Sequence, residues 1–322
     1  MNMSKLIAIG EALIDFIPQE TGKAIRHVNA FEPKVGGAPA NVCGVFAKMG
    51  QQSQMITQLG NDPFGDKILE TFEHYGIGCD YIKRTDEANT SLAFVSLQEN
   101  GDREFSFYRN PGADMLMDAN DIHPQWFEDA DVLHFCSVSL GDFPMKSAHK
   151  KAIEYARQSG CTISFDPNLR FPLWKDKEQL LRAVKEFMPL AHILKISDEE
   201  LEFLTGHKDI NRAKEELLQG NTELVIYTEG SKGAQAFTRF ASAQAPGQSQ
   251  GAVDTTGAGD AFIGSFLYQL TRDGIVHSDL SGLTPAMLER YLTFSNSYCA
   301  KSVMRHGAIE SYPDRKEMEK QR

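Results

Sequence analysis

A short run of small residues just before an amphipathic segment is the part of this sequence best suited to chemistry. The run Val253–Asp260 reads VDTTGAGD, and large apolar residues then recur at helical spacing over 262–270. Gly257 and Gly259 would let a ligand approach the backbone, so amides at the start of this helix could bind an anion. Asp260 would then lie beside a bound phosphate, where a carboxylate can take the proton of an attacking hydroxyl.

A purely structural role for the same residues is the competing interpretation. Thr255 or Thr256 would cap the helix, and Asp260 would only complement the helix dipole. The glycines match neither the GxxxxGK[ST] loop nor a GxGxxG turn after an N-terminal strand, so these two nucleotide-binding classes are disfavoured. Spacing alone leaves phosphate chemistry and helix capping open.

The rest of the chain alternates between short apolar runs and segments of helical periodicity. The runs expected to be strands are 6–9, 55–59, 132–135, 162–165, 192–196 and 224–228. The segments expected to be helices are 40–49, 66–75, 145–159, 177–188 and 212–219. This alternation predicts an α/β fold with a doubly wound, mainly parallel sheet.

Two segments, 16–34 and 89–110, break the alternation. The second has apolar residues at alternate positions on both sides of Asn100-Gly101-Asp102, and an Asn-Gly pair is a strong hairpin signal. We expect the two segments to form a small antiparallel sheet that covers the cleft of the main body as a lid. The chain is therefore predicted to be a single domain over 1–322, with a polar loop at 241–251.

Composition limits the classes of partner. The 44 acidic and 33 basic residues give a formal net charge of -11, which disfavours binding to nucleic acid and to anionic membranes. The five cysteines are scattered without a CxxC pair, so we expect them to be reduced. No apolar run approaches the ~20 residues of a membrane span. We expect a cytoplasmic enzyme that acts on small molecules.

The run DTTGAGDAF at 254–262 resembles the second signature of the ribokinase-like, or PfkB, carbohydrate kinase family. VGGAPANV at 35–42 resembles the first signature, and GNDPFG at 60–65, FDPNLR at 165–170 and TEGSKG at 228–233 continue the resemblance. It implies a ribokinase-like fold with a β lid, and an ATP-dependent sugar kinase. Such a kinase needs Mg²⁺ to neutralise the β- and γ-phosphates of ATP.

The resemblance also implies roles for individual residues. Asp260 is the expected catalytic base, the backbone of Gly257, Ala258 and Gly259 the expected anion hole, and Arg170 the side chain that approaches the sugar or the transferred phosphate. The residues expected around the sugar are Asp15, Gly36, Gly37, Asn41, Phe94, Phe107, Arg109, Arg170 and Asp260. Purely structural alternatives stay open. They are a turn role for Asp15, a helix start at Asn41, a solvated Arg170 and simple sheet alternation for the aromatic residues.

For the nucleotide and ions the resemblance implies a further set. The residues expected at ATP are Lys195, Thr228, Gly230, Gly233, Gly257, Gly259 and Asn296. Glu200 would contact Mg²⁺ through water, although Ser197 replaces the asparagine of the family's Asn-x-x-Glu motif, and a solvated acidic helix is the alternative. Asp254 and Thr256 fall where relatives bind a monovalent cation such as K⁺.

The stretches 107–116, 166–174 and 195–206 are most similar to fructokinases. Fructose, converted to fructose 6-phosphate, is therefore the expected substrate. Ribose, 2-keto-3-deoxygluconate or an aminoimidazole riboside remain alternatives, as does a catalytically silent, sugar-binding regulatory relative. The lid sheets of relatives often pair, so a homodimer through the lid is also expected.

Overall fold

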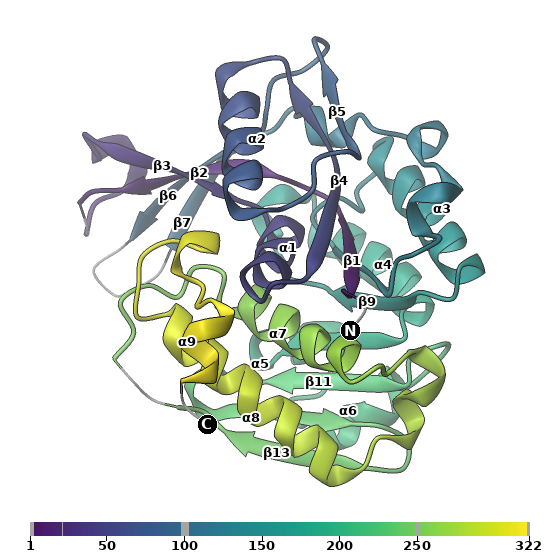
Figure 1. Ribbon diagram of the computed structural model, residues 1–322. Coiled ribbons are helices and arrows are strands. Elements are labelled where there is room, and N and C mark those ends of the chain that lie inside the picture. Colours follow the sequence, from purple (N-terminus) through teal and green to yellow (C-terminus); the bar gives the residue numbers. More distant parts are fainter. Residues whose placement is uncertain (1–2, 21, 98–102, 249–250, 321–322) are drawn as a thin grey trace.

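A nine-stranded sheet forms the body of the computed structural model, which describes residues 3–20, 22–97, 103–248 and 251–320 (Figure 1). The strands, in their order across the sheet, are β13 (Ser242–Pro246), β12 (Gly233–Phe237), β11 (Leu224–Thr228), β10 (Ile193–Ser197), β9 (Thr162–Asp166), β8 (Val132–Cys136), β1 (Lys5–Ile9), β4 (Gln52–Gly60) and β5 (Ile82–Thr85). All neighbours from β11 to β5 pair in parallel, whereas β12 pairs antiparallel with both β11 and β13. The predicted α/β fold with a mainly parallel sheet is confirmed.

Helices cover both faces of this sheet and bury two apolar cores. One core contains α1 (Ala38–Lys48), α2 (Pro63–Tyr75), α7 (Ala258–Arg272) and α8 (Pro285–Ser302), and the other contains α3 (Met145–Gln158), α4 (Lys177–Phe187), α5 (Asp198–Thr205) and α6 (Ile210–Leu217). Strand β1 lies in the middle of the sheet and is covered on both faces, so all of its residues are buried. Leu6 and Ala8 enter the first core while Ile7 and Ile9 enter the second, as a strand buried on both faces requires.

A second sheet of four strands projects from the body (Figure 1). Its order is β3 (Phe31–Gly36), β2 (Leu13–Pro18), β6 (Leu92–Leu97) and β7 (Arg103–Tyr108), and we call it the lid. The hairpins β2–β3 and β6–β7 are antiparallel, but β2 pairs with β6 in parallel, with Ile14 opposite Leu92. The expectation of a fully antiparallel lid was therefore wrong at its centre, because both central strands leave the body in the same direction. The predicted turn at 100–102 lies outside the described residues.

The predicted loop at 241–251 was wrong in its first half. Ser242–Pro246 forms the edge strand β13, which pairs with β12 from Gly233 to Phe237. Its alanine, serine and glutamine residues have weak strand propensity, so backbone pairing and the contact with α8 decide its conformation. The short helix α9 (Arg315–Glu319) follows near the end of the chain. Within the described residues, no helix is both long and apolar enough to cross a membrane.

Candidate active site

A cavity of about 880 Å³ lies between the lid and the ends of the parallel strands. The lid contributes residues of β2, β3, β6 and β7, and the body contributes the start of α1, the loop after β9, Lys195 on β10 and the segment before α7. Ligands of open α/β sheets bind beyond the carboxyl ends of the strands, where loops and helix N-termini converge. The cavity therefore occupies the place where this fold binds small molecules.

Helix α7 begins at one wall of this cavity. Gly257 precedes the helix in the left-handed conformation, with φ of 71°, and a Cβ there would lie 2.5 Å from the Tyr312 hydroxyl. That hydroxyl donates to the Gly257 carbonyl at 2.9 Å and fixes the turn. The amide of Ala258 donates to the Thr255 carbonyl at 3.2 Å, so this one of the three predicted anion-binding amides already has an acceptor. Gly257 and Gly259 also line the cavity.

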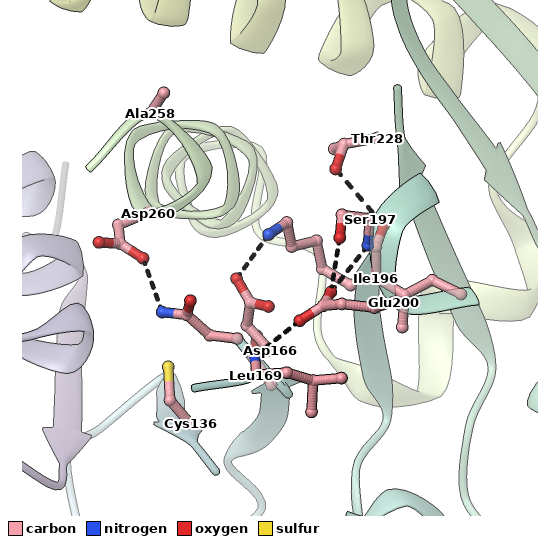
Figure 2. A network of polar contacts seen from close by, with 12 residues as sticks. Cys136, Asp166, Leu169, Ile196, Ser197, Glu200, Thr228, Ala258 and Asp260 are labelled. Carbon is pink, nitrogen blue, oxygen red and sulfur yellow. Dashed lines mark hydrogen bonds and ion pairs between the residues drawn. The ribbon is translucent and has the colours of Figure 1, made fainter. Parts of the chain in front are cut away.

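Asp260 lies in the first turn of α7 and is buried in the cavity wall (Figure 2). Asn41 Nδ2 donates to its Oδ2 at 2.8 Å, and Asn168 Nδ2 lies 3.5 Å from its Oδ1. Burial raises the pKa of Asp260, while the bond from Asn41 and the charges of Lys195 and Arg170 oppose this rise. The result is an oriented carboxylate with increased basicity, as a general base requires.

A buried ion pair lies close to the same helix end. Lys195 Nζ is 2.8 Å from Asp166 Oδ2, and the two side chains are 6% and 1% exposed. Burial raises the pKa of Asp166 to about 7 against the opposing charge of Lys195. Burial alone would lower the pKa of Lys195, but the carboxylates of Asp166 and Glu200 outweigh it and raise that pKa. A Cβ on Gly259 would lie 3.1 Å from Lys195 Nζ, so a permanent cation and a helix N-terminus meet here and favour an anion.

Glu200 performs a structural task. Its Oε1 accepts from the Leu169 amide at 2.8 Å, and its Oε2 accepts from the amide and hydroxyl of Ser197 at 2.9 and 3.0 Å (Figure 2). Glu200 thereby caps α5 and holds the loop that carries Asn168 and Arg170. It does not line the cavity, so the water-mediated contact with Mg²⁺ stays a prediction. Among the described residues, no group of three or more His, Cys, Asp or Glu side chains is placed to hold a metal ion.

The segment 35–42, which resembles the first signature of the family, packs tightly against the base of the lid. Asp15 on β2 lines the cavity, and a Cβ on Gly36 would collide with its carboxylate. Gly37 has φ of 110°, and a Cβ there would collide with the carbonyl of Glu11. At Gly37 only glycine fits without moving the backbone, whereas a side chain at Gly36 would displace the carboxylate of Asp15. Arg170 also reaches the cavity, and its Nη1 donates to the Leu169 carbonyl at 3.0 Å.

The lid residues differ from expectation. Phe107 lines the cavity, but Phe94 lies on the opposite face, stacked on Phe16 with ring centroids 4.5 Å apart. The register explains this, because Phe107 pairs with Ala93 and not with Phe94. Placing Phe94 over the sugar was therefore wrong. Val95 and Phe105, which the sequence analysis did not single out, line the cavity instead, and the alternation of β6 and β7 could have revealed them.

The side chain of Arg109 is buried against Asp114. Its guanidinium is 3% exposed and forms an ion pair with Asp114, with Nε and Nη2 at 2.8 and 2.5 Å from the same carboxylate oxygen. It is absent from the cavity lining, although it contacts the carbonyl of Val138, which lines the cavity. A role for Arg109 at the sugar stays a prediction.

The residues predicted at the nucleotide base and ribose do not line this cavity. Thr228, Gly230 and Gly233 lie at the end of β11 and in the turn that follows it, on the same edge of the sheet as Lys195. The Asn296 amide donates to the Ala245 and Pro246 carbonyls, each at 3.0 Å, and ties α8 to β13. Of the residues expected at ATP, the structure thus places Lys195, Gly257 and Gly259 in the cavity and leaves Thr228, Gly230, Gly233 and Asn296 outside it.

The residues predicted at a monovalent cation do lie together. Asp254 Oδ1 accepts from the Thr256 amide at 2.9 Å and from its hydroxyl at 2.6 Å, and Asp254 Oδ2 accepts from the Gly307 amide at 3.0 Å. This loop borders the cavity beside Gly257. Both oxygens of Asp254 therefore already accept hydrogen bonds, and the cation role of Asp254 and Thr256 stays a prediction.

Comparison with known proteins agrees with this site. The pfkB family carbohydrate kinase profile matches residues 3–315. Fructokinase-2 of Solanum habrochaites is 37% identical over 309 residues, covering 96% of this chain and 93% of the relative. The fructokinase of Xylella fastidiosa with bound ATP superposes with a TM-score of 0.88 at 33% identity, covering 98% of this chain and 97% of that one.

The fructokinase of Vibrio cholerae O395, solved with fructose, ADP and a calcium ion, superposes with a TM-score of 0.88 at 31% identity over 99% of this chain and 98% of that one. A variant of that enzyme was solved with fructose, ADP and a potassium ion. The chain belongs to the pfkB family of carbohydrate kinases, and it is an ATP-dependent, fructokinase-like sugar kinase.

Proposed function

We propose that the protein transfers the γ-phosphate of ATP to fructose and forms fructose 6-phosphate. The observation that carries the proposal is the position of Asp260, an amide-held carboxylate of raised pKa at the N-terminus of α7, inside the cavity that also contains Asp15 and Arg170. The relatives named fructokinase across nearly the whole chain support fructose as the acceptor. No feature of the cavity favours one of the alternative sugars over fructose.

In this proposal each group has one task. The carboxylate of Asp260 accepts the proton of the sugar hydroxyl while the hydroxyl oxygen attacks the γ-phosphorus and ADP leaves. The backbone at Gly257 and Gly259 and the ammonium of Lys195 stabilise the negative charge on the transferring phosphoryl group. Asp15 and Asn41 hold the sugar hydroxyls, and Arg170 orients the phosphate.

Mg²⁺ would enter with the phosphates of ATP and neutralise their charge. Asp166 fits a place beside it, because its buried Oδ1 has no hydrogen-bond partner among the described residues. Glu200 fits only an outer role through water, since both its oxygens already accept bonds. Asp254 and Thr256 are candidates for a K⁺ site because a relative was solved with a potassium ion, although both oxygens of Asp254 already accept bonds here.

The nucleotide would lie along the sheet edge beyond the cavity, next to Lys195. Thr228, Gly230 and Gly233 are candidates for the ribose and phosphates. Gly230 has a positive φ and no atom within 4 Å of a Cβ position, so its backbone is open to a ligand, whereas Gly233 packs against the backbone of β13 and shapes the turn. Asn296 would act at adenine through its oxygen, since its amide nitrogen is engaged by β13.

Fructose is expected to exceed every other acceptor in kcat/KM by at least about tenfold, or roughly 1.4 kcal/mol of transition-state binding. Initial rates with Mg-ATP and coupled detection of ADP test this across fructose, ribose, glucose, mannose, 2-keto-3-deoxygluconate and an aminoimidazole riboside. A higher kcat/KM for another sugar would replace fructose as the substrate. Turnover with none of them would favour a regulatory sugar-binding role.

We also propose a homodimer through the outer face of the lid. Phe16, Phe31, Phe94 and Tyr108 contact one another on this face, and Tyr108 is 65% exposed. Phe16, Phe31 and Phe94 are half-buried, so the exposed Tyr108 ring is the part of this aromatic face that a partner would cover. Tyr108→Glu is expected to convert the dimer to monomers in light scattering, whereas Phe240→Glu, at an exposed turn of the body, leaves the mass unchanged. A wild-type monomer would exclude the dimer.

A further inference from the structure

The four strands of the lid leave and re-enter the body beside one buried group of polar side chains. Ser91 directly precedes β6, Arg109 directly follows β7, Glu11 precedes β2 and Ala38 follows β3. Glu11, Ser91 and Arg109 are 3%, 1% and 9% exposed, so water does not satisfy these groups. They are joined through Asp114 and Ser139 of the body, and we call these side chains the hinge network.

Asp114 connects the two ends of the β6–β7 hairpin. Its Oδ1 accepts from the Ser91 hydroxyl at 2.5 Å, and its Oδ2 accepts from Arg109 Nε and Nη2 at 2.8 and 2.5 Å. One carboxylate therefore holds the residue before the first strand of the hairpin and the residue after the second. Charge-assisted bonds of this kind are stronger than neutral ones, and the low exposure prevents screening.

Arg109 connects this hairpin to the body. Its Nη1 donates to the Val138 carbonyl at 3.2 Å and its Nη2 to the Ser139 hydroxyl at 3.2 Å, both in the loop after β8. The guanidinium also lies 5.4 Å from the centroid of the Phe143 ring. These contacts use most of the donors of the arginine, so its orientation is fully determined.

Glu11 connects the network to the segment 35–42, which resembles the first signature of the family. The Ser139 hydroxyl donates to Glu11 Oε2 at 3.4 Å, and Glu11 Oε1 accepts from the Ala38 amide at 3.1 Å, next to Gly37. Burial raises the pKa of Glu11 to about 7, and the charge of Arg109 opposes this rise. The ionised form of Glu11 thus depends on Arg109, so the two sides of the network are energetically linked.

The packing around the network leaves little room for adjustment. A Cβ on Gly112 would lie 2.8 Å from Arg109 Cγ and 2.8 Å from Asp114 Oδ1, and it would collide with the Ser91 hydroxyl. Small displacements of one member must therefore move the others. Every lid strand begins or ends at this rigid group.

We propose that Glu11, Arg109 and Asp114 are positioning residues for sugar binding, because their network fixes the roots of the lid relative to the backbone of Gly37 and Ala38. The inference rests on the proposed function in one respect, namely that the lid cavity is where the sugar binds. Arg109 and Asp114 do not line the cavity, and Glu11, which does, uses its Oε1 to hold the Ala38 amide. They set the angle at which Asp15 and Phe107 of the lid meet the body.

The test compares Arg109→Lys and Asp114→Asn with Lys5→Met. The control breaks the ion pair of Lys5 with Asp129, 2.6 Å long, at the opposite end of β1, so it weakens the protein without touching the lid. We expect the two network variants to raise the KM for the sugar at least tenfold, with the KM for ATP within twofold and kcat within threefold of wild type. The control is expected to change none of these constants. Unchanged sugar KM in folded network variants, or an equal rise in both KM values, would overturn the proposal.

Hydrogen exchange gives a readout that needs no turnover. Amides of β2, β3, β6 and β7 are expected to exchange at least tenfold faster in Asp114→Asn, while amides of β8, β9 and β10 keep their wild-type rates. If the lid amides exchange at wild-type rates, the network does not hold the lid and the proposal fails. If the lid loosens but wild-type enzyme phosphorylates no sugar, the proposed function fails while the hinge role stands.

Discussion

Replacing Asp260 with asparagine is expected to lower kcat by about 10²- to 10⁴-fold and to leave the KM for fructose nearly unchanged. Asparagine has the same shape, so the bond from Asn41 to the side-chain oxygen can persist. The amide cannot accept the proton of the sugar hydroxyl, however, so the loss falls on the chemical step. Steady-state rates and fructose binding by calorimetry separate the two effects.

The pH dependence of the wild-type enzyme supplies a second check. Burial raises the pKa of Asp260, and only the ionised carboxylate can act as a base. The acidic limb of kcat/KM should therefore lie above the ordinary aspartate value of about 3.9, with activity lost as the pH falls through the raised pKa. Ser265→Ala, one turn further along α7, is the matched control and should keep its activity. Near wild-type turnover in Asp260→Asn would refute the base assignment.

Lys195→Met is expected to cost about 3 to 5 kcal/mol of unfolding free energy, because it leaves Asp166 buried without its cation. The same change should abolish most activity, since the cation beside Gly259 is lost. In this variant the folded-state pKa of Asp166 rises further above its unfolded value. The contribution of Asp166 to the free energy of unfolding is therefore most favourable at low pH, and it decreases as the pH rises from about 4 through the raised pKa. Urea unfolding across this range measures the effect.

A double variant separates stability from catalysis. Lys195→Met combined with Asp166→Leu removes both charges, and replacing a buried pair by apolar side chains is often neutral for stability. We expect the double variant to recover most of the unfolding free energy without recovering turnover. Recovery of activity together with stability would show that the ion pair serves only to fold the protein.

The sequence was most informative where a site is formed by consecutive residues. The small-residue turn before α7 places Gly257, Gly259 and Asp260 together by local geometry, and the structure lines the cavity with all three. Apolar runs such as Leu224–Thr228 also become buried strands, because a strand covered on both faces must be apolar throughout. The fold and the family could therefore be predicted.

Features that depend on pairing between distant segments could not be predicted as well. The face on which Phe94 lies follows from the register of β6 with β7, and a shift of one residue reverses it. The partner of Arg109 is Asp114, whose position after the lid is set by the surrounding loops. Glu11 carries no motif signal of its own, and its importance becomes visible only from its bonds in the folded chain.

The parallel pairing of β2 with β6 has a consequence for how the molecule is made. Ile14 aligns with Leu92, so the lid joins two hairpins whose residues are synthesised far apart. A polypeptide that ends before Leu92 would have only β2–β3, and an isolated hairpin is marginally stable in water. Non-local pairing of this kind forms slowly. Recognition of the acceptor should therefore emerge late in maturation, after the first strands of the body have already assembled.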